Sequence, residues 1–332
     1  MRVLVTGADG FIGSHLVEKL LKNNFKVTAL CSYNSFSNPG WLNFIYTKKK
    51  RNLDVVFGDI RDDRIFDRLL LKNKIILHLA ALIGIPYSFE APKSYVDTNL
   101  YGTLNLLNSA LRRNINRIIL TSTSEVYGSG KYFPIDEKHP LVAQSPYAAT
   151  KIAADKLALS YFAAFNLPVS IMRPFNAFGP RQSRRAVIPS IIYQALEKKS
   201  ITLGNINAYR DFNYVEDITD AYLKATKVNI NKIKGEEINI GSNYSVSIKQ
   251  VANMIKKIVK KDIPIKIDKK RFRPNKSEVN KLMGSNKKAK KLLNWKPKYS
   301  GTKNFYNGLK KTVEWYKINN NLPIFSKKSY EK

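Results

Sequence analysis

Short runs of apolar, often β-branched residues recur along the first half of the chain. Continuous runs of this kind are typical of strands that are buried on both faces of a parallel sheet. The runs cover residues 2–6, 25–31, 53–57, 75–79, 117–120 and 169–173. Stretches with the three-to-four-residue apolar spacing of helices lie between several of them. This alternation predicts an α/β fold built on a parallel sheet.

The helical spacing is clearest in three stretches, residues 14–21, 95–113 and 147–166. Beyond residue 175 the pattern becomes mixed. There we expect helices near 187–198, 216–227, 247–259 and 302–318, and short strands near 201–203, 213–215 and 237–240. We therefore predict a sheet domain at 1–175, to which later strands return, and a smaller C-terminal lobe at 176–332.

Glycines follow the first apolar run in the order Gly7-Ala8-Asp9-Gly10-Phe11-Ile12-Gly13, and helical spacing begins directly afterwards. Glycines in this context give a tight turn, backbone approach to a pyrophosphate and close packing of the helix. The phosphates then lie at the helix N-terminus. A turn that merely ends a strand is the alternative. We predict a Rossmann-type doubly wound sheet with a dinucleotide site at Gly7, Gly10, Phe11, Ile12 and Gly13.

The second strand ends at Cys31, where a Rossmann site commonly places an acid that binds the adenosine ribose of NAD. The acid is missing, and so is the arginine that would suit the 2′-phosphate of NADP. We expect NAD as the cofactor, and NADP stays possible.

Candidate chemistry follows the strand at 117–120. Thr123 and Glu125 come directly after it, at the end of a parallel strand where α/β proteins bind ligands. Tyr147 and Lys151 begin the next helix and, four residues apart, share one face of it. An ammonium beside a phenol favours the phenolate, so we expect Lys151 to lower the Tyr147 pKa and make the phenol a base. An ordinary amphipathic helix would explain Tyr-x-x-x-Lys alone, but not the whole combination.

Together these features resemble the extended short-chain dehydrogenase/reductase family, which includes epimerases and dehydratases of nucleotide sugars. The resemblance covers nearly the whole chain and implies Thr123, Glu125, Tyr147 and Lys151 as catalytic residues. It implies that the cofactor also contacts Asp59, Ile60, Leu79, Ala80, Ala81, Tyr147 and Lys151. It implies that the substrate contacts Ser88, Thr123, Ser124, Asn176, Arg181, Arg210 and Arg273. Asp59 as a helix cap, and Arg210 or Arg273 as ordinary surface, remain alternatives.

The same resemblance implies further partners and structure. Two helices, near 95–113 and 147–166, pair in the family with their counterparts in a second subunit, so we expect a homodimer or homotetramer. Asn99 matches a family residue that lies against the cofactor-side helix, although a plain helix-interior asparagine explains it equally well.

The type of reaction depends on Glu125. In the family's dehydratases this position holds the base for the C5 proton, whereas epimerases typically lack it. Thr-Ser-Glu resembles GDP-mannose 4,6-dehydratase and UDP-glucuronate decarboxylase, and Ser124 leaves open which group protonates the departing hydroxyl. Longer stretches resemble the bacterial GDP-N-acetylglucosamine 4,6-dehydratases of legionaminic acid biosynthesis. We expect a hydro-lyase, and a C4 epimerase or a UDP-hexuronate decarboxylase is the alternative.

Composition narrows the remaining classes. The chain has 332 residues, one cysteine and a formal net charge of +32. Its lysines are spread along the sequence, so we interpret them as solvated surface that attracts an anionic substrate rather than nucleic acid. A non-catalytic polyanion-binding protein is suggested by the charge alone. Without an apolar run of membrane-spanning length, a metal-ligand cluster or a disulfide pair, we expect a cytoplasmic protein with no metal and no membrane partner.

Overall fold

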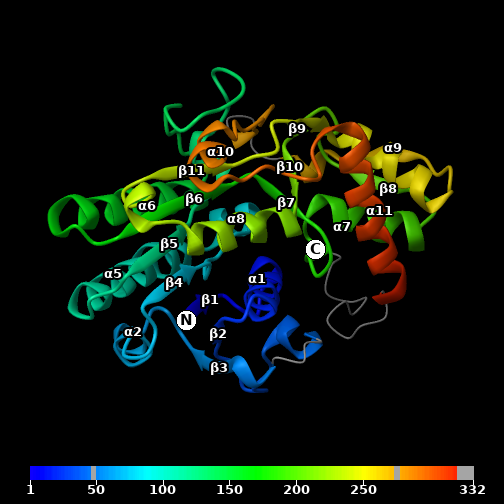
Figure 1. Cartoon of the computed structure of the whole chain (residues 1–332). Coiled ribbons are helices and arrows are strands. Elements are labelled where there is room, and N and C mark those ends of the chain that lie inside the picture. The colour runs from blue at the N-terminus through cyan, green and yellow to red at the C-terminus, as the bar shows by residue number, and fades with distance from the viewer. Residues whose placement is uncertain (46–49, 273–276, 320–332) are drawn as a thin grey trace.

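The computed structural model describes residues 1–45, 50–272 and 277–319. A seven-stranded sheet forms its centre, with the strand order β11-β6-β5-β4-β1-β2-β3 and parallel pairing throughout (Figure 1). The strands are β1 (Arg2–Thr6), β2 (Lys26–Ser32), β3 (Leu53–Gly58), β4 (Ile75–His78), β5 (Arg117–Thr121), β6 (Val169–Pro174) and β11 (Glu237–Ile240). The predicted doubly wound α/β fold is confirmed. The strand order reverses between β1 and β4, which is where ligands bind in such sheets.

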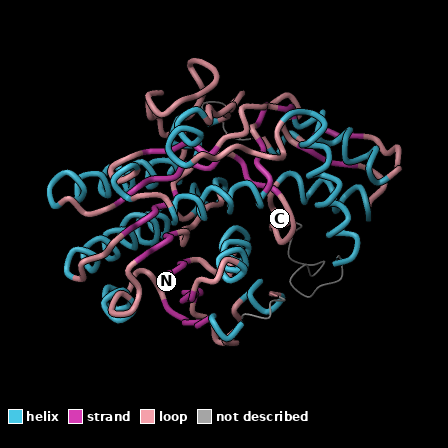
Figure 2. The backbone as a smooth tube through the Cα atoms, viewed as in Figure 1, coloured by secondary structure: helices cyan, strands magenta, loops and turns pink. Residues whose placement is uncertain are grey.

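Both faces of the sheet are covered by helices (Figures 1 and 2). Val3 and Val5 of β1 belong to the core on one face and Leu4 to the core on the other, as the two-residue period of a strand requires. The first core contains α1 (Phe11–Lys22), α8 (Val215–Lys227) and α10 (Lys287–Leu293). The second contains α2 (Asp63–Leu69), α5 (Gly102–Arg112) and α6 (Pro146–Phe165). Burial on both sides explains why these strands read as continuous apolar runs.

The second half of the chain builds a lobe with its own apolar core. Its helices are α7 (Val187–Glu197), α9 (Ile248–Val259) and α11 (Gly301–Asn319). Its strand pairs are β7 (Asn176–Phe178) with β10 (Phe212–Tyr214), β9 (Tyr209–Arg210) with β12 (Val246–Ser247), and β8 (Ile201–Leu203) with β13 (Ile265–Ile267). Among the strands described in this half, only β11 joins the main sheet, beside β6. We keep the division near residue 175 as a proposal.

Short helical segments connect the layers. They are α3 (Ile85–Glu90), α4 (Pro92–Tyr95), the π-helical η3 (Val96–Tyr101), and the 3-10 turns η1 (Gly40–Phe44), η2 (Lys50–Asn52), η4 (Ser124–Tyr127), η5 (Ile230–Lys232) and η6 (Lys269–Arg271). Within the described part of the chain, no helix combines the length and apolar character needed to cross a membrane.

The single long helix predicted for residues 95–113 is wrong in one respect. A π-helical turn, η3, divides it into α4 and α5. In α5, which follows the turn, Leu106 and Leu107 are buried whereas Leu111, near the end of the helix, is 41% exposed. The turn contains Asn99, whose side-chain amide bonds both backbone groups of Leu82. π-Helical turns are frequent at functional sites.

The glycine turn sets a close backbone contact that a substitution can probe. A Cβ added at Gly13 would stand 2.1 Å from the Gly7 carbonyl oxygen, whereas one at Gly10 would stand 3.3 Å from the same atom. We expect Gly13→Ala to lower the free energy of unfolding by at least ~1–3 kcal/mol, because the backbone must move apart. Gly10→Ala should cost much less, and equal losses for the two variants in urea denaturation would contradict this packing.

Candidate active site

The loop after β1 lies against the loop after β4. Gly7 has a φ of +63°, and an added Cβ there would stand 2.9 Å from the Ala80 backbone. The Thr6 hydroxyl accepts hydrogen bonds from Leu79 N at 3.1 Å and Ala80 N at 3.0 Å. Two groups of residues expected to bind the cofactor, Gly7–Gly13 and Leu79–Ala81, are therefore brought together at the switch point of the sheet.

The first turn of α1 suits a diphosphate. Gly10 caps the helix without a side-chain hydrogen bond, and the first turn contains no acidic residue. The early N–H groups of the helix and its dipole therefore face the loop without a competing side chain. Beyond the Gly7 oxygen, nothing lies within 4 Å of a Cβ built on Gly10, so ligand phosphates could approach the backbone there. These residues fit a dinucleotide.

His78 ends β4 and is buried. Its Nδ1 lies 2.9 Å from the Thr6 hydroxyl, and burial lowers the His78 pKa to about 3. The ring is therefore neutral and orients Thr6, which holds the loop after β4.

Three of the expected catalytic residues converge beyond β5. Thr123 caps η4 by accepting a hydrogen bond from Glu125 N at 3.2 Å. The Thr123 hydroxyl also hydrogen-bonds the Tyr147 phenol, and the charge of Glu125 is near enough to raise the Tyr147 pKa. Ser145 caps α6 through Ala148 N, which fixes the start of the helix that carries Tyr147. The Thr123 hydroxyl and the Tyr147 phenol are thus in contact, and the Glu125 carboxylate lies within electrostatic range of the phenol.

Lys151 does not lower the Tyr147 pKa in this structure, contrary to expectation. Its Nζ donates to the Thr121 carbonyl at 2.6 Å. Burial raises the Tyr147 pKa well above its usual value, and Glu125 and Asp155 raise it further. The Thr123 hydrogen bond opposes these effects and lowers the pKa. Tyr147 and Lys151 do lie on the same buried face of α6, as predicted from their spacing.

A buried ionic network behind Lys151 was missed by the sequence reasoning. Asp155, one turn further along α6, accepts hydrogen bonds from Ser122 Oγ at 2.7 Å and Arg173 Nη2 at 3.0 Å. Arg173 also donates to Glu237 on β11 at 2.5 Å. Asp155 and Arg173 are fully buried. The available signals were an acid four residues after Lys151 and an arginine inside an apolar strand.

The expected substrate residues differ in their surroundings. Asn176 has a buried Oδ1 without a hydrogen-bond partner, and Ser124 is buried in η4. Ser88 is fully buried and donates to Ile85 O at 2.7 Å. Arg181 pairs with Glu18 of α1 at 2.7 Å, on the cofactor side of the molecule.

Arg210 is buried on β9. Its Nη1 donates to Val279 O at 2.6 Å, and its Nη2 lies 3.4 Å from a carboxylate oxygen of Glu278. Arg273, the second arginine expected at the phosphates, lies outside the described residues.

A small pocket adjoins Glu125. It is narrow and is lined by Ile85, Glu125, Gln144, Ser145, Ala148 and Ser277. The Ser277 hydroxyl is buried and has no hydrogen-bond partner among the described residues. Nothing in the sequence pattern indicated Ser277, because it comes from a distant loop of the lobe.

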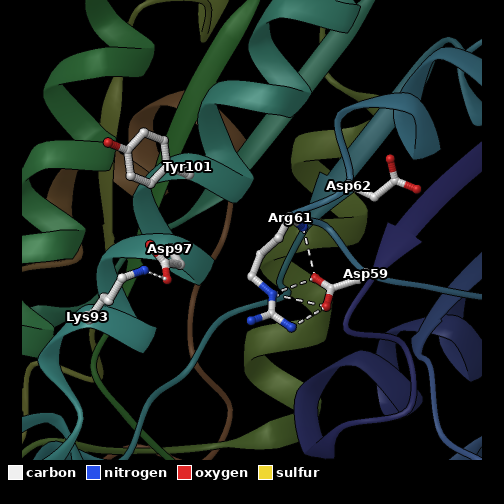
Figure 3. Close-up of a pocket in the computed structure, with 6 residues that line it drawn as sticks. All are labelled: Asp59, Arg61, Asp62, Lys93, Asp97 and Tyr101. Atoms are coloured by element: carbon white, nitrogen blue, oxygen red, sulfur yellow. Dashed lines mark hydrogen bonds and ion pairs between the residues drawn. The ribbon is translucent and has the colours of Figure 1, made fainter.

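A second, open pocket lies around Asp59 (Figure 3). The Asp59 carboxylate accepts hydrogen bonds from the Arg61 amide at 2.9 Å and from the Arg61 guanidinium. The alternative interpretation of Asp59 as a helix cap is wrong, because Asp62 caps α2 by accepting from Arg64 N at 3.0 Å. Ile60 is buried, against Gly102 of α5.

The glycine turn lies at the switch point of the sheet, and Thr123, Glu125, Tyr147 and Lys151 follow β5 in the chain. These features are those of an extended short-chain dehydrogenase/reductase. The model of the family described as GDP-mannose 4,6 dehydratase matches residues 4–307, and the chain belongs to this family. Similar proteins carry several activities in their names. The dTDP-D-glucose 4,6-dehydratase of Homo sapiens is 32% identical, in an alignment that covers 96% of this chain and 90% of the relative.

Two further comparisons point to the same group. The putative UDP-glucose 4-epimerase of Methanocaldococcus jannaschii is 33% identical over 96% of this chain and 99% of its own length. The structure of UDP-glucuronic acid 4-epimerase from Bacillus cereus in complex with UDP-glucuronic acid and NAD has a TM-score of 0.86 and 29% identity. It matches 96% of this chain and 99% of its own. Dehydratases and epimerases of nucleotide sugars thus share this architecture.

The Asp155–Arg173 pair should be necessary for stability. Asp155→Ala leaves Glu237 as a partner of the buried Arg173 guanidinium, so the charge is only partly compensated, and we expect the free energy of unfolding to fall by about 3 kcal/mol. Asp67→Ala is the control. Asp67 pairs with Arg112 on the surface, where the two side chains are 33% and 57% exposed, and a loss under about 1 kcal/mol is expected. If both variants lose the same free energy of unfolding in urea denaturation, the buried pair contributes no more to stability than the surface pair.

Proposed function

We propose that this chain is a nucleotide-sugar 4,6-dehydratase. The observation that carries the proposal is the position of Glu125, a carboxylate close enough to the Tyr147 phenol to raise its pKa. Oxidation at C4 makes the C5 proton acidic, so a second base beside the first is what an elimination requires and an epimerisation does not. Glu125 and Tyr147 supply such a pair.

The residues divide the reaction between them. Tyr147 takes the proton of the C4 hydroxyl, and the Thr123 hydroxyl binds the same oxygen. Glu125 then takes the C5 proton and passes it to the C6 hydroxyl, which leaves as water. C5 regains a proton from solvent when the hydride reaches C6. A bound nicotinamide supplies reversible hydride transfer, accepting from C4 and returning the hydride to C6. Lys151 is expected to bind the nicotinamide ribose.

Binding of the nucleotide sugar is assigned to the lobe side of the site. Asn176 offers a buried, unpartnered carbonyl oxygen, and Arg210 and Arg273 are the proposed ligands of the diphosphate. We propose GDP-N-acetylglucosamine as the substrate, on the resemblance of the longer sequence stretches to that group of dehydratases.

A dimer is part of the proposal. Helices α5 and α6 lie side by side along one edge of the molecule (Figure 1). Near their C-terminal ends, Leu111 is 41% and Phe165 55% exposed. We propose that these two helices pair with the same helices of a second copy.

Product mass tests the reaction. We expect GDP-N-acetylglucosamine to lose the mass of one water, giving a 4-keto-6-deoxy sugar, when incubated with the protein and NAD. GDP-, UDP- and dTDP-linked hexoses and a UDP-hexuronate complete the panel. An unchanged mass with an inverted C4 favours the epimerase, and loss of carbon dioxide favours the decarboxylase. If no hexose in the panel loses water, the dehydratase assignment fails.

Two substitutions should stop the reaction at different steps. Tyr147→Phe removes the base for C4 oxidation, so added substrate should leave the cofactor oxidised. Glu125→Gln keeps the shape of the side chain but not the base, so C4 oxidation proceeds and reduced cofactor accumulates with the 4-keto sugar. Product formation by Glu125→Gln should fall by about 10²–10⁴-fold, as for a lost general base. Absorbance of the reduced nicotinamide separates the two outcomes.

The melting temperatures of both variants provide the control for folding. Near-normal product from a folded Glu125→Gln variant would refute the role of Glu125. Reduced cofactor in Tyr147→Phe would equally refute the assignment of the first base.

A further inference from the structure

The end of β2 offers no charge to hold an adenosine ribose. Cys31 occupies the position where a Rossmann site commonly has an acid, and its side chain is buried. Burial and the neighbouring charge of Asp9 raise the pKa of the Cys31 thiol to about 12. The thiol is therefore neutral at any pH at which the protein works.

Asp9 of the glycine turn lies beside this position. Its Oδ2 accepts a hydrogen bond from Ser32 N, the last residue of β2, at 3.3 Å. Its backbone N–H faces the Cys31 sulfur. The Asp9 carboxylate thus belongs to the loop after β1, but it lies at the end of β2, where a Rossmann site commonly has its acid.

The position of Asp9 is fixed from a second side. Trp41 N, in η1, donates to the Asp9 carbonyl at 3.2 Å. Gly40 has a φ of +57°, and an added Cβ there would stand 2.7 Å from the same carbonyl oxygen. The turn, the end of β2 and η1 are therefore packed against one another around Asp9.

The Asp9 carboxylate is not neutralised by a neighbour. Burial raises its pKa, and hydrogen bonds from its own amide and from Ser32 oppose this. No lysine or arginine in the described ranges contributes to this balance. A half-buried carboxylate without a cation is a strong acceptor for hydroxyl groups and an unfavourable neighbour for a phosphate.

We propose that Asp9 determines the choice of cofactor by accepting hydrogen bonds from the adenosine ribose hydroxyls of NAD. The glycine turn carries the pyrophosphate, and the ribose is the next group along the dinucleotide. NADP carries a phosphate of about two negative charges on that ribose, which would be forced against the Asp9 carboxylate. Asp9 thus takes over the role of the acid that is missing at Cys31.

Competition for the site tests this directly. The full-length protein is dialysed against equal concentrations of NAD and NADP, and the bound nucleotides are released by denaturation and separated by chromatography. We expect the wild type to retain NAD over NADP by about 100-fold. Asp9→Asn, which removes the charge and keeps the shape, should lower this ratio by at least about tenfold.

Asp54→Asn is the matched control. Asp54 is an exposed carboxylate on the neighbouring β3, and it forms an ion pair with Arg2 at 3.7 Å. Its removal changes the net charge as Asp9→Asn does, and the NAD-to-NADP ratio should stay that of the wild type.

Two results would overturn the proposal: wild-type protein that retains NADP as readily as NAD, or an Asp9→Asn ratio equal to the wild type. Asp9→Ser, a smaller neutral variant judged by the same ratio, replaces Asp9→Asn if that variant does not fold. The measurement needs no sugar substrate. Its outcome is therefore independent of whether the chain is a dehydratase.

Discussion

The backbone contact between the glycine turn and its surroundings is the constraint on which the site depends. An added Cβ at Gly7 would come within 2.9 Å of Ala80, and one at Gly13 within 2.1 Å of the Gly7 oxygen. Because Gly7 and Gly13 have no side chains, the backbone of the glycine turn packs closely against α1 and against the loop after β4. These three segments together form one surface that suits a dinucleotide. Thr6 and His78 then hold the loop after β4 by hydrogen bonds, so the ends of the adjacent strands β1 and β4 determine the position of this surface.

Most of this architecture could be predicted from the sequence, because buried positions form recognisable apolar patterns along the chain. Strands covered on both faces become apolar runs, and the glycine turn needs three glycines at fixed spacing. The approach of Tyr147 to Thr123 also follows from their places at the end of a strand and the start of a helix. The π-helical turn η3 leaves no comparable signal. It exists because Asn99 bonds Leu82 and Thr150, which are contacts between distant parts of the chain.

The electrostatics of the site could not be predicted from spacing. Tyr147 and Lys151 share a face of α6 as expected, yet the ammonium bonds the Thr121 carbonyl instead of favouring a phenolate. What spacing cannot register is desolvation: a phenol as buried as Tyr147 resists ionisation whatever its neighbour four residues away. Asp155 adds to this effect from the same face of the helix, and its partner Arg173 comes from β6.

Taken together, these charges indicate how the two proposed bases could be kept in order. Burial and the neighbouring Glu125 both raise the Tyr147 pKa and so disfavour the phenolate. The hydrogen bond between the Thr123 hydroxyl and the Tyr147 phenol oxygen has the opposite effect and lowers the Tyr147 pKa. A substrate hydroxyl that displaces water from this buried point would give the phenolate a further hydrogen bond and so lower its cost. If Tyr147 is the base that we propose, burial and the nearby carboxylate therefore make its ionisation depend on a hydrogen bond from the bound substrate.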